Sequence, residues 1–232
     1  MVFLLLNTII LIMISPIFLI AIYKFLLEKK KKKKKNSIMI IGPSGSGKTT
    51  FFYYLLGYKD TETVASMQIN KIENYSTELL SSNSSYDIID VPGTGYYKEK
   101  IIELLPHTII ILVFIDSTQK NSIIQTAEYL YDILNSDKYK EDINIYISCN
   151  KQDSGFPKSK KMIENELAKE IENLIKIKQK NNLEDKEQIG ILFQMKGKFS
   201  FKMFSNLFFF ETSFKSKYQS LFQKVKFDLK NM

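Results

Sequence analysis

One segment of the chain has the residue types and the spacing of a phosphate-binding loop. Residues 42–49 read Gly-Pro-Ser-Gly-Ser-Gly-Lys-Thr, which fits the pattern G-x-x-x-x-G-K-[S/T]. The glycines of this pattern let successive backbone N–H groups curve around phosphate oxygens, and the lysine brings a positive charge to the outer phosphates. The residues expected to bind a nucleoside triphosphate are Gly42, Ser44, Gly45, Ser46, Gly47, Lys48, Thr49 and Thr50.

A magnesium site is expected beside this loop. The hydroxyl of Thr49 is the oxygen that the loop normally offers to Mg²⁺. Further along, Asp90-Val91-Pro92-Gly93 has the form D-x-x-G and ends an apolar run. In this pattern we expect Asp90 to hold the ion through water and the backbone N–H of Gly93 to contact the γ-phosphate. The sequence therefore predicts that the ligand is a complex of a triphosphate with Mg²⁺.

The base of the nucleotide is indicated by a third motif. Asn150-Lys151-Gln152-Asp153 follows a strand-like run, and it has the form N-K-x-D. The carboxylate of Asp153 can accept hydrogen bonds from both N1–H and the N2 amino group of guanine, a pair of donors that adenine lacks. Binding ATP would leave this acceptor unpaired, which costs free energy. We therefore expect GTP, with Asn150, Lys151 and Asp153 at the guanine end.

A fourth segment resembles the S-A-K loop that closes over guanine. It begins at Glu211, and its central residues are Ser213 and Phe214, so that Phe replaces the usual Ala. The contact that such a loop makes with the base is mainly through its backbone. We therefore expect Ser213 and Phe214 to line the base despite the change of side chain.

The elements that must position these motifs can be read from the apolar pattern. Runs of apolar residues predict buried strands, and apolar residues three and four apart predict amphipathic helices. Alternating strands and helices predict a doubly wound, mostly parallel α/β sheet of the P-loop small-GTPase type, with the ligand loops at the strand C-termini. The expected strands are residues 38–41, 86–90, 109–115, 143–149 and 207–210, and the expected helices are residues 50–56, 123–134 and 158–176. The polar residues 181–200 are expected to form a flexible surface loop.

The N-terminal part has a different composition from the rest. Residues 2–27 contain one charge, Lys24, and exceed the ~20 apolar residues that a transmembrane helix needs. The unbroken lysine run 29–35 follows, which predicts that the rest of the chain is cytosolic. A cleaved signal peptide is disfavoured, because such peptides carry their positive charge before the apolar core. We expect a membrane anchor at 1–28, a polybasic linker at 29–36 and a GTP-binding domain at 37–232.

The overall charge excludes one class of partner. The net charge is +8, and subtracting the seven residues of the lysine run leaves about +1 for the remainder, so we expect no direct binding of nucleic acid. All 33 basic residues are lysine, so the chain cannot place an arginine finger in its own site. Cys149 is the single cysteine, which rules out an internal disulfide.

With its four motifs in order behind an expected anchor, the chain resembles the signal recognition particle receptor β subunits. The resemblance extends beyond the general GTPase motifs, because the guanine loop also has the Cys149 and Gln152 of that family. Further segments that resemble the family are residues 58–63, 158–176, 197–199 and 210–215. The resemblance implies that Thr63 is the switch I ligand of Mg²⁺, and Thr61 is the alternative. It also implies a receptor α subunit as partner, tethered by the chain to the endoplasmic reticulum membrane for co-translational targeting.

One residue departs from the usual pattern and bears on catalysis. Many GTPases have Gln directly after D-x-x-G, where it orients the attacking water, and this family often has His. Here the residue is Thr94, which is too short for that role. We therefore expect very slow intrinsic hydrolysis and a protein that acts as a GTP-held switch. The alternatives are an ADP-ribosylation-factor-like or Sar-like GTPase of vesicle traffic, and a degenerate P-loop protein with a structural nucleotide.

Overall fold

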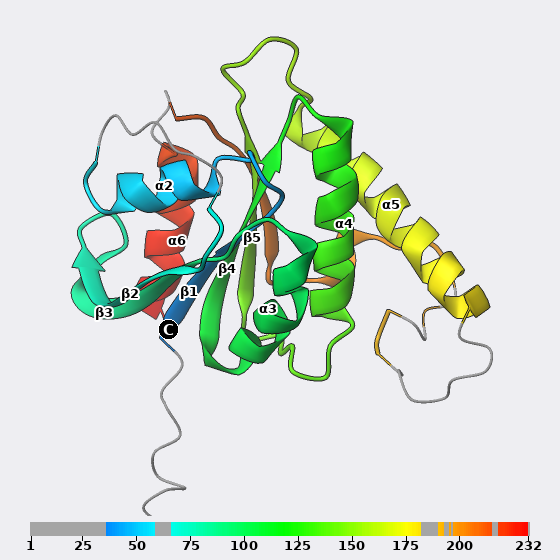
Figure 1. Ribbon diagram of the computed structural model, residues 1–232, viewed down its shortest axis with the longest axis horizontal. Coiled ribbons are helices and arrows are strands. Elements are labelled where there is room, and N and C mark those ends of the chain that lie inside the picture. Colours follow the sequence, from blue (N-terminus) through cyan, green and yellow to red (C-terminus); the bar gives the residue numbers. More distant parts are fainter. Residues whose placement is uncertain are drawn as a thin grey trace, which may run out of the picture. The chain divides into compact units, whose positions relative to one another are not determined.

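A six-stranded, mostly parallel sheet forms the centre of the computed structural model, which describes residues 36–58, 66–181, 190–192, 195, 197–214 and 218–231. The strand order is β2-β3-β1-β4-β5-β6, and only β2 is antiparallel to its neighbour (Figure 1). The strands are β1 (Ser37–Ile41), β2 (Asn70–Thr77), β3 (Ser81–Asp90), β4 (Thr108–Asp116), β5 (Asn144–Asn150) and β6 (Leu207–Glu211). The predicted α/β fold class is confirmed for this part of the chain.

The central strands are covered on both faces, which explains their continuous apolar sequences. Every residue of β1 is buried, and β4 reads Thr-Ile-Ile-Ile-Leu-Val-Phe-Ile-Asp. In the register of the sheet, Ile40 is paired with Asp90, and Asp116 is paired with Asn150. The ends of these strands therefore meet at one edge of the sheet, where the predicted motifs begin.

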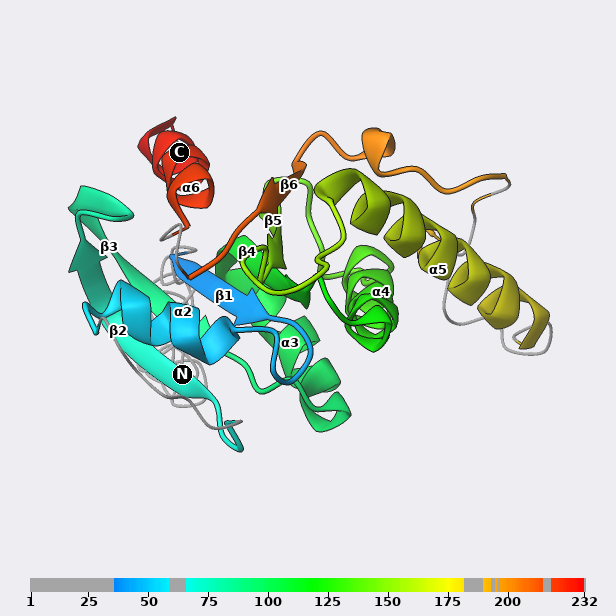
Figure 2. The ribbon, with the colours of Figure 1, turned by 90° about the horizontal axis from the view of Figure 1, so that it is seen from above.

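Helices cover both faces of the sheet (Figure 2). One face carries α2 (Lys48–Leu55) and α6 (Gln219–Asn231), and the other carries α3 (Lys98–Leu104), α4 (Lys120–Leu134) and α5 (Lys160–Asn181). On the first face the core is rich in aromatic rings, and Phe51 packs against Phe114, Tyr218 and Phe222. On the second face the core is mainly aliphatic. This packing holds α2 and α4 at the edge where the motifs lie.

Some local predictions were incomplete or wrong. The elements β2, α3 and α6 were not predicted, and helix α5 runs five residues further than expected, to Asn181. The prediction of a flexible surface loop over 181–200 is wrong for two of its described apolar residues, because Leu192 is fully buried and Phe199 is 2% exposed. Phe199 packs edge-on against Phe201, with ring centroids 4.9 Å apart. The buried apolar residues of this segment are separated by polar ones with no helical or strand period, so the sequence pattern did not indicate their burial.

Several predictions fall on residues outside the described part of the chain. These are the anchor at 2–27, the lysine run, and both candidate switch I threonines, Thr61 and Thr63. Among the described helices, none has the length and apolar character needed to cross a membrane.

Candidate nucleotide-binding site

The phosphate loop leaves β1 through backbone conformations that favour glycine. Gly42, Gly45 and Gly47 have φ angles of 137°, 75° and 96°. A Cβ added at Gly42 would lie 2.2 Å from the carbonyl oxygen of Phe114 on β4. The loop can therefore begin directly above the sheet only because this position has no side chain.

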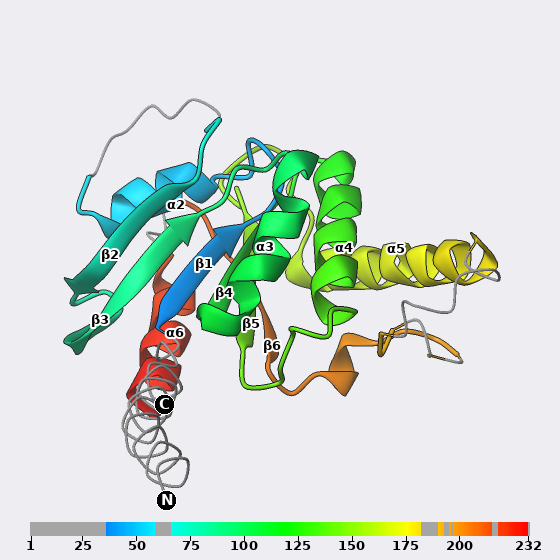
Figure 3. The same ribbon diagram turned by 60° about the horizontal axis from the view of Figure 1, so that its bottom comes forward.

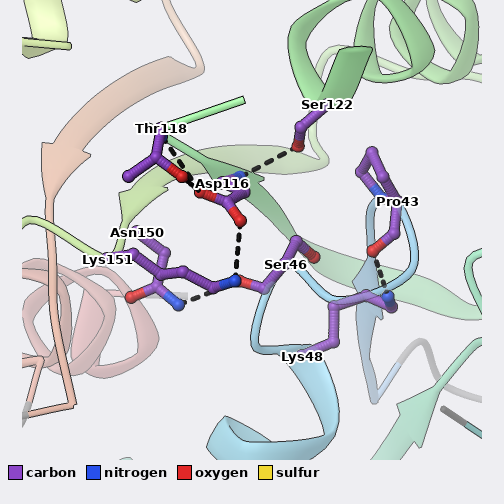
Figure 4. Close-up of polar contacts among 8 residues, drawn as sticks. All are labelled: Pro43, Ser46, Lys48, Asp116, Thr118, Ser122, Asn150 and Lys151. Carbon is purple, nitrogen blue, oxygen red and sulfur yellow. Dashed lines mark hydrogen bonds and ion pairs between the residues drawn. The ribbon is translucent and has the colours of Figure 1, made fainter. Parts of the chain in front are cut away.

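A direct contact joins the phosphate loop to the segment that follows β5. The side-chain Nδ2 of Asn150 donates a hydrogen bond of 2.9 Å to the backbone oxygen of Ser46 (Figure 4). A Cβ at Gly47 would lie 2.3 Å from the same nitrogen, so the absence of a side chain there makes room for Asn150. Two of the sequence motifs, about a hundred residues apart, are thus held together by one buried amide.

Lys48 is the buried cation of the loop. Its side chain lies at the start of α2, and its Nζ donates to the backbone oxygen of Pro43 at 2.8 Å. Burial lowers the pKa of Lys48 to about 8, although the nearby Asp90 carboxylate acts in the opposite direction. A cavity of about 330 Å³ opens beside it, and its lining is Ser44, Gly45, Gly47, Lys48, Thr49, Thr50, Ser66, Pro92, Gly93 and Lys151. This cavity has the donors that a polyphosphate requires.

Two of the predicted metal ligands, Thr49 and Asp90, lie in contact. Thr49 Oγ1 donates to Asp90 Oδ2 at 3.0 Å, and the other oxygen of Asp90, Oδ1, is buried without a hydrogen-bond partner among the described residues. Burial raises the pKa of Asp90, although hydrogen bonds from Asn70 and Thr49 and the charge of Lys48 oppose this. A buried carboxylate with one unused oxygen beside a hydroxyl fits the oxygen ligands that Mg²⁺ prefers. The residues present are therefore suited to this ion.

Two residues near this pair were not predicted. Ser66 Oγ lies 3.0 Å from Thr49 Oγ1, and Asn70 Nδ2 donates to Asp90 Oδ2 at 3.1 Å. Asn70 is the first residue of β2, a polar strand with no clear apolar alternation. The only signal for either residue is that both follow the expected switch I segment.

Gly93 approaches the phosphate loop closely. A Cβ at this position would lie 2.3 Å from the backbone nitrogen of Ser44 and 2.6 Å from the oxygen of Gly42. The D-x-x-G segment is thereby packed onto the loop, as its predicted contact with the outer phosphate requires. Thr94, which follows, is exposed, and its side chain caps no helix.

At the guanine end, backbone and side-chain hydrogen bonds tie two segments together. The backbone N–H of Gln152 donates to the oxygen of Thr212, and the N–H of Thr212 donates to the oxygen of Cys149, both at 3.1 Å. Thr212 Oγ1 also donates to Asn150 Oδ1 at 3.3 Å. The N-K-x-D segment and the segment after β6 therefore form one unit.

Lys151 is held by an acid that the motif does not contain. Its φ angle is 63°, and its Nζ lies 2.6 Å from Asp116 Oδ2 at the end of β4 (Figure 4). Burial opposes ionisation of Asp116, but hydrogen bonds from Lys151 and Thr118 outweigh it and hold the pKa of Asp116 below its usual value. The signal for Asp116 was present in the sequence, as an acid at the end of an apolar run.

The remaining predicted residues lie around this unit. Asp153 is exposed, Ser213 is buried, and Phe214 is half-buried with its ring packed edge-on against Tyr54 at 6.1 Å. The side chain of Gln152 points back, with Nε2 donating to Ser117 Oγ and to the oxygen of Lys158, both at 3.0 Å. Gln152 therefore stabilises the loop from its inner side, and Asp153 lies on its solvent-exposed side.

Comparison with known proteins identifies the family of this chain. The family model described as signal recognition particle receptor beta subunit matches residues 33–207. The chain belongs to this family. Receptor beta subunits similar to it include that of Mus musculus, 31% identical over 122 residues, or 50% of this chain and 43% of that protein. The subunit of Dictyostelium discoideum is 30% identical over 123 residues, 52% of this chain and 42% of that protein. The matched part thus spans less than half the length of these relatives.

Solved structures of this family have the same fold. The structure of the mammalian SRP receptor superimposes with a TM-score of 0.67 and 24% identity, over 82% of this chain and 98% of that one. The receptor SRb-GTP/SRX complex from Chaetomium thermophilum gives a TM-score of 0.57 with 16% identity, over 77% of this chain and 93% of that one. At these identities the likeness establishes the fold of the described domain.

Proposed function

We propose that the chain is a GTP-binding β subunit of the signal recognition particle receptor, which anchors the receptor α subunit at the endoplasmic reticulum membrane. The observation that carries this proposal is the contact between Asn150 and Ser46, because it joins a phosphate cavity to a guanine-type loop in one site. Membership of the family supports the specific role. The same membership does not favour the vesicle-traffic alternative.

The roles of the site residues follow from their positions. The phosphate-loop backbone and Lys48 would hold the triphosphate, and Asp153 would accept the two donors of guanine. Thr49 and Asp90 would hold Mg²⁺, which supplies charge neutralisation to the phosphates when it is bound. Thr63, or alternatively Thr61, would complete this set from switch I.

Hydrolysis is expected to be slow for two reasons. Thr94 has neither the length nor the amide that orients a water molecule in other GTPases, and the chain has no arginine to stabilise the developing charge. Bound GTP would then act by setting the conformation of the surface around the cavity. The chain would then be a GTP-held switch, or latch, that works by binding a partner and not by turnover.

The surface around the cavity is suited to a protein partner. Met67 and Tyr96 are 88% and 87% exposed, and they lie one and three residues from the cavity residues Ser66 and Gly93. The hydroxyl of Tyr97 donates to the backbone oxygen of Met67 at 2.8 Å, which joins the segment before β2 to the segment after D-x-x-G. The Chaetomium thermophilum structure is a complex of a receptor SRb with GTP and SRX. By analogy, we assign the α subunit to this surface and residues 2–27 to the membrane.

Nucleotide binding by the full chain in detergent is the first test. Calorimetry should show GTP bound and ATP not bound, in the presence of Mg²⁺. Asp153→Asn removes one acceptor with little change of shape, so it should weaken GTP binding and reduce the preference over ATP. Equal binding of the two nucleotides by the unmodified chain would overturn the proposal.

Capture of the partner is the second test. The full chain, loaded with a non-hydrolysable GTP analogue or with GDP, is mixed with a purified receptor α subunit. Retention with the analogue alone is expected, and Tyr96→Ala should abolish it while GTP binding persists. Single-turnover hydrolysis that is fast without any partner would contradict the latch and favour a cycling GTPase.

A further inference from the structure

The outward side of helix α6 carries an exposed aromatic ring between two lysines. Phe227 is 61% exposed, Lys226 is half-buried, and Lys230 is exposed one turn further on. The opposite side of the same helix is buried, with Leu221, Val225 and Leu229 in the core. We refer to Lys226, Phe227 and Lys230 as the α6 patch.

The charges of the α6 patch are not compensated. Lys224, one turn earlier, pairs with Asp228 at 2.8 Å, and Asp228 also accepts a hydrogen bond from Tyr146. Lys226 instead donates to a backbone oxygen, that of Glu78, at 2.8 Å. Within the described residues, neither Lys226 nor Lys230 forms an ion pair. The patch is therefore cationic around an apolar centre, a combination suited to an anionic lipid surface.

The topology places the α6 patch at the end of the domain where β1, its first strand, starts. Helix α6 follows β6 and returns toward the starting ends of the parallel strands, and Glu78 precedes β3 at that same end. Strand β1 also starts there, at Ser37 (Figure 3). The phosphate loop follows the other end of β1. The patch and the nucleotide cavity are therefore at opposite ends of the sheet.

The length of chain before β1 limits how far this end can be from a membrane. If residues 2–27 span the bilayer, nine residues, 28–36, connect the span to β1. Fully extended, they reach about 30 Å at 3.3–3.6 Å per residue. The stretch contains seven lysines, a residue type that anionic headgroups attract. An anionic bilayer surface is thus the large partner closest to the patch.

We propose that the α6 patch contacts the anionic headgroup region of the membrane in which the chain is anchored. The contact fixes the orientation of the domain, with the nucleotide cavity directed away from the bilayer. It does not depend on the nucleotide, because none of its residues lies near the cavity. The proposal rests on the membrane anchor of the proposed function.

A lipid-depth measurement on the full chain tests this contact. Phe227→Cys is labelled with a polarity-sensitive fluorophore, and the chain is reconstituted in vesicles of phosphatidylcholine with or without phosphatidylserine. Cys149 remains unlabelled in the folded chain, because it is fully buried and burial raises the pKa of its thiol to about 12. We expect blue-shifted emission that spin-labelled lipids quench in phosphatidylserine vesicles, and much weaker quenching without phosphatidylserine.

Matched variants locate the effect. Phe156 is likewise an exposed aromatic residue, in fact 100% exposed, but it lies beside the guanine loop, so a label at Phe156→Cys should remain unquenched. The double variant Lys226→Glu and Lys230→Glu should abolish quenching at position 227, since each lysine shifts such a contact by about five-fold. Lys120→Glu with Lys161→Glu makes the same charge change on exposed lysines at the other end, and quenching should persist.

The outcomes separate this proposal from the proposed function. Absence of quenching at position 227 in a chain that resists alkaline extraction and binds GTP overturns the contact alone. Equal quenching at positions 156 and 227 overturns it as well. So does a disulfide cross-link between two unlabelled Phe227→Cys chains, if the labelled chains show no quenching. Quenching at 227 without GTP binding supports the contact and contradicts the proposed function. A chain extracted by alkali contradicts the anchor and this proposal together.

Discussion

The two halves of the nucleotide site are built in different ways. The phosphate half, residues 42–49, is shaped by its backbone, with three glycines at positive φ and one buried lysine. The guanine half, residues 150–153 and 211–214, is held by hydrogen bonds between two segments and by the pair of Lys151 with Asp116. The shape of the phosphate half depends on glycines, which have no side chain. The guanine half depends on hydrogen bonds between segments and on an ion pair. Substitutions should therefore act differently on the two halves.

Gly42→Ala is expected to have the largest effect. The new Cβ would lie 2.2 Å from the oxygen of Phe114, at a φ of 137°. Left-handed strain costs about 1–2 kcal/mol and overpacking about 1–3 kcal/mol, so we expect the free energy of unfolding to fall by about 3 kcal/mol. Gly57→Ala is the matched control, because its φ is 89° and its Cβ would meet open space, and it should cost about 1 kcal/mol. Urea unfolding followed by circular dichroism compares them, and equal losses would show that the contact with Phe114 has no role.

Removal of each lysine compares the two halves next. Lys48→Gln deletes a buried charge, and hydrogen bonds to charged groups contribute about 1.5–3 kcal/mol, so GTP affinity should fall by roughly 100-fold. Lys151, whose side chain is 35% exposed, should matter less, with a loss of about five-fold or below in Lys151→Gln. Calorimetric titration of both variants measures the difference. A larger loss at Lys151 would contradict the view that the phosphate half provides most of the affinity.

Asn150→Ala tests the connection between the halves. The variant loses the hydrogen bonds to Ser46 and Thr212, at about 1 kcal/mol each, so unfolding should become easier by about 2 kcal/mol. The preference for GTP over ATP should also decrease, because the guanine half is no longer aligned with the phosphates. Thr212→Val removes only one of these bonds and should cost about 1 kcal/mol. If Asn150→Ala binds GTP and ATP in the original ratio, the connection has no part in base selection.

The smallest expected effect is a dependence on pH that belongs to the phosphate half. The pKa of Lys48 is about 8 in the free domain, and phosphate binding requires the charged form. GTP affinity should therefore be nearly constant below pH 7 and should fall by about five-fold between pH 8 and 9. On folding stability the sign is opposite, because the unfolded chain holds this proton more tightly, so stability rises between pH 8 and 10.5. Titration of Lys48→Gln should lack both slopes, and a slope that persists would assign them to another group.

The phosphate half could be predicted from sequence because it is local. Eight consecutive residues contain the glycines and Lys48, and an apolar strand before them fixes the direction of the loop. The D-x-x-G and N-K-x-D motifs follow strands in the same manner, since β3 ends at Asp90 and β5 ends at Asn150. Parallel strands bring such ends together without further information.

The rest depended on pairings between distant residues. Asp116 joins Lys151 across 35 positions, and Ser66 and Asn70 reach Thr49 and Asp90 from a polar strand that no apolar pattern marks. Helix α6 was not predicted, although Leu221, Val225 and Leu229 have helical spacing. Leu192 and Phe199 are likewise buried in the core beside α4 and α5, and no local pattern marks them for it. Periodicity shows which face of an element is apolar, and it does not show what covers that face.

The amide of Asn150 has a consequence for how long a nucleotide remains bound. Because Nδ2 occupies the space left by Gly47 and holds Ser46, a displacement of the loop around the phosphates must also disturb the loop around the base. Departure would then be a single concerted opening, with no intermediate released at one end. An exchange factor could act on either loop and accelerate the same step.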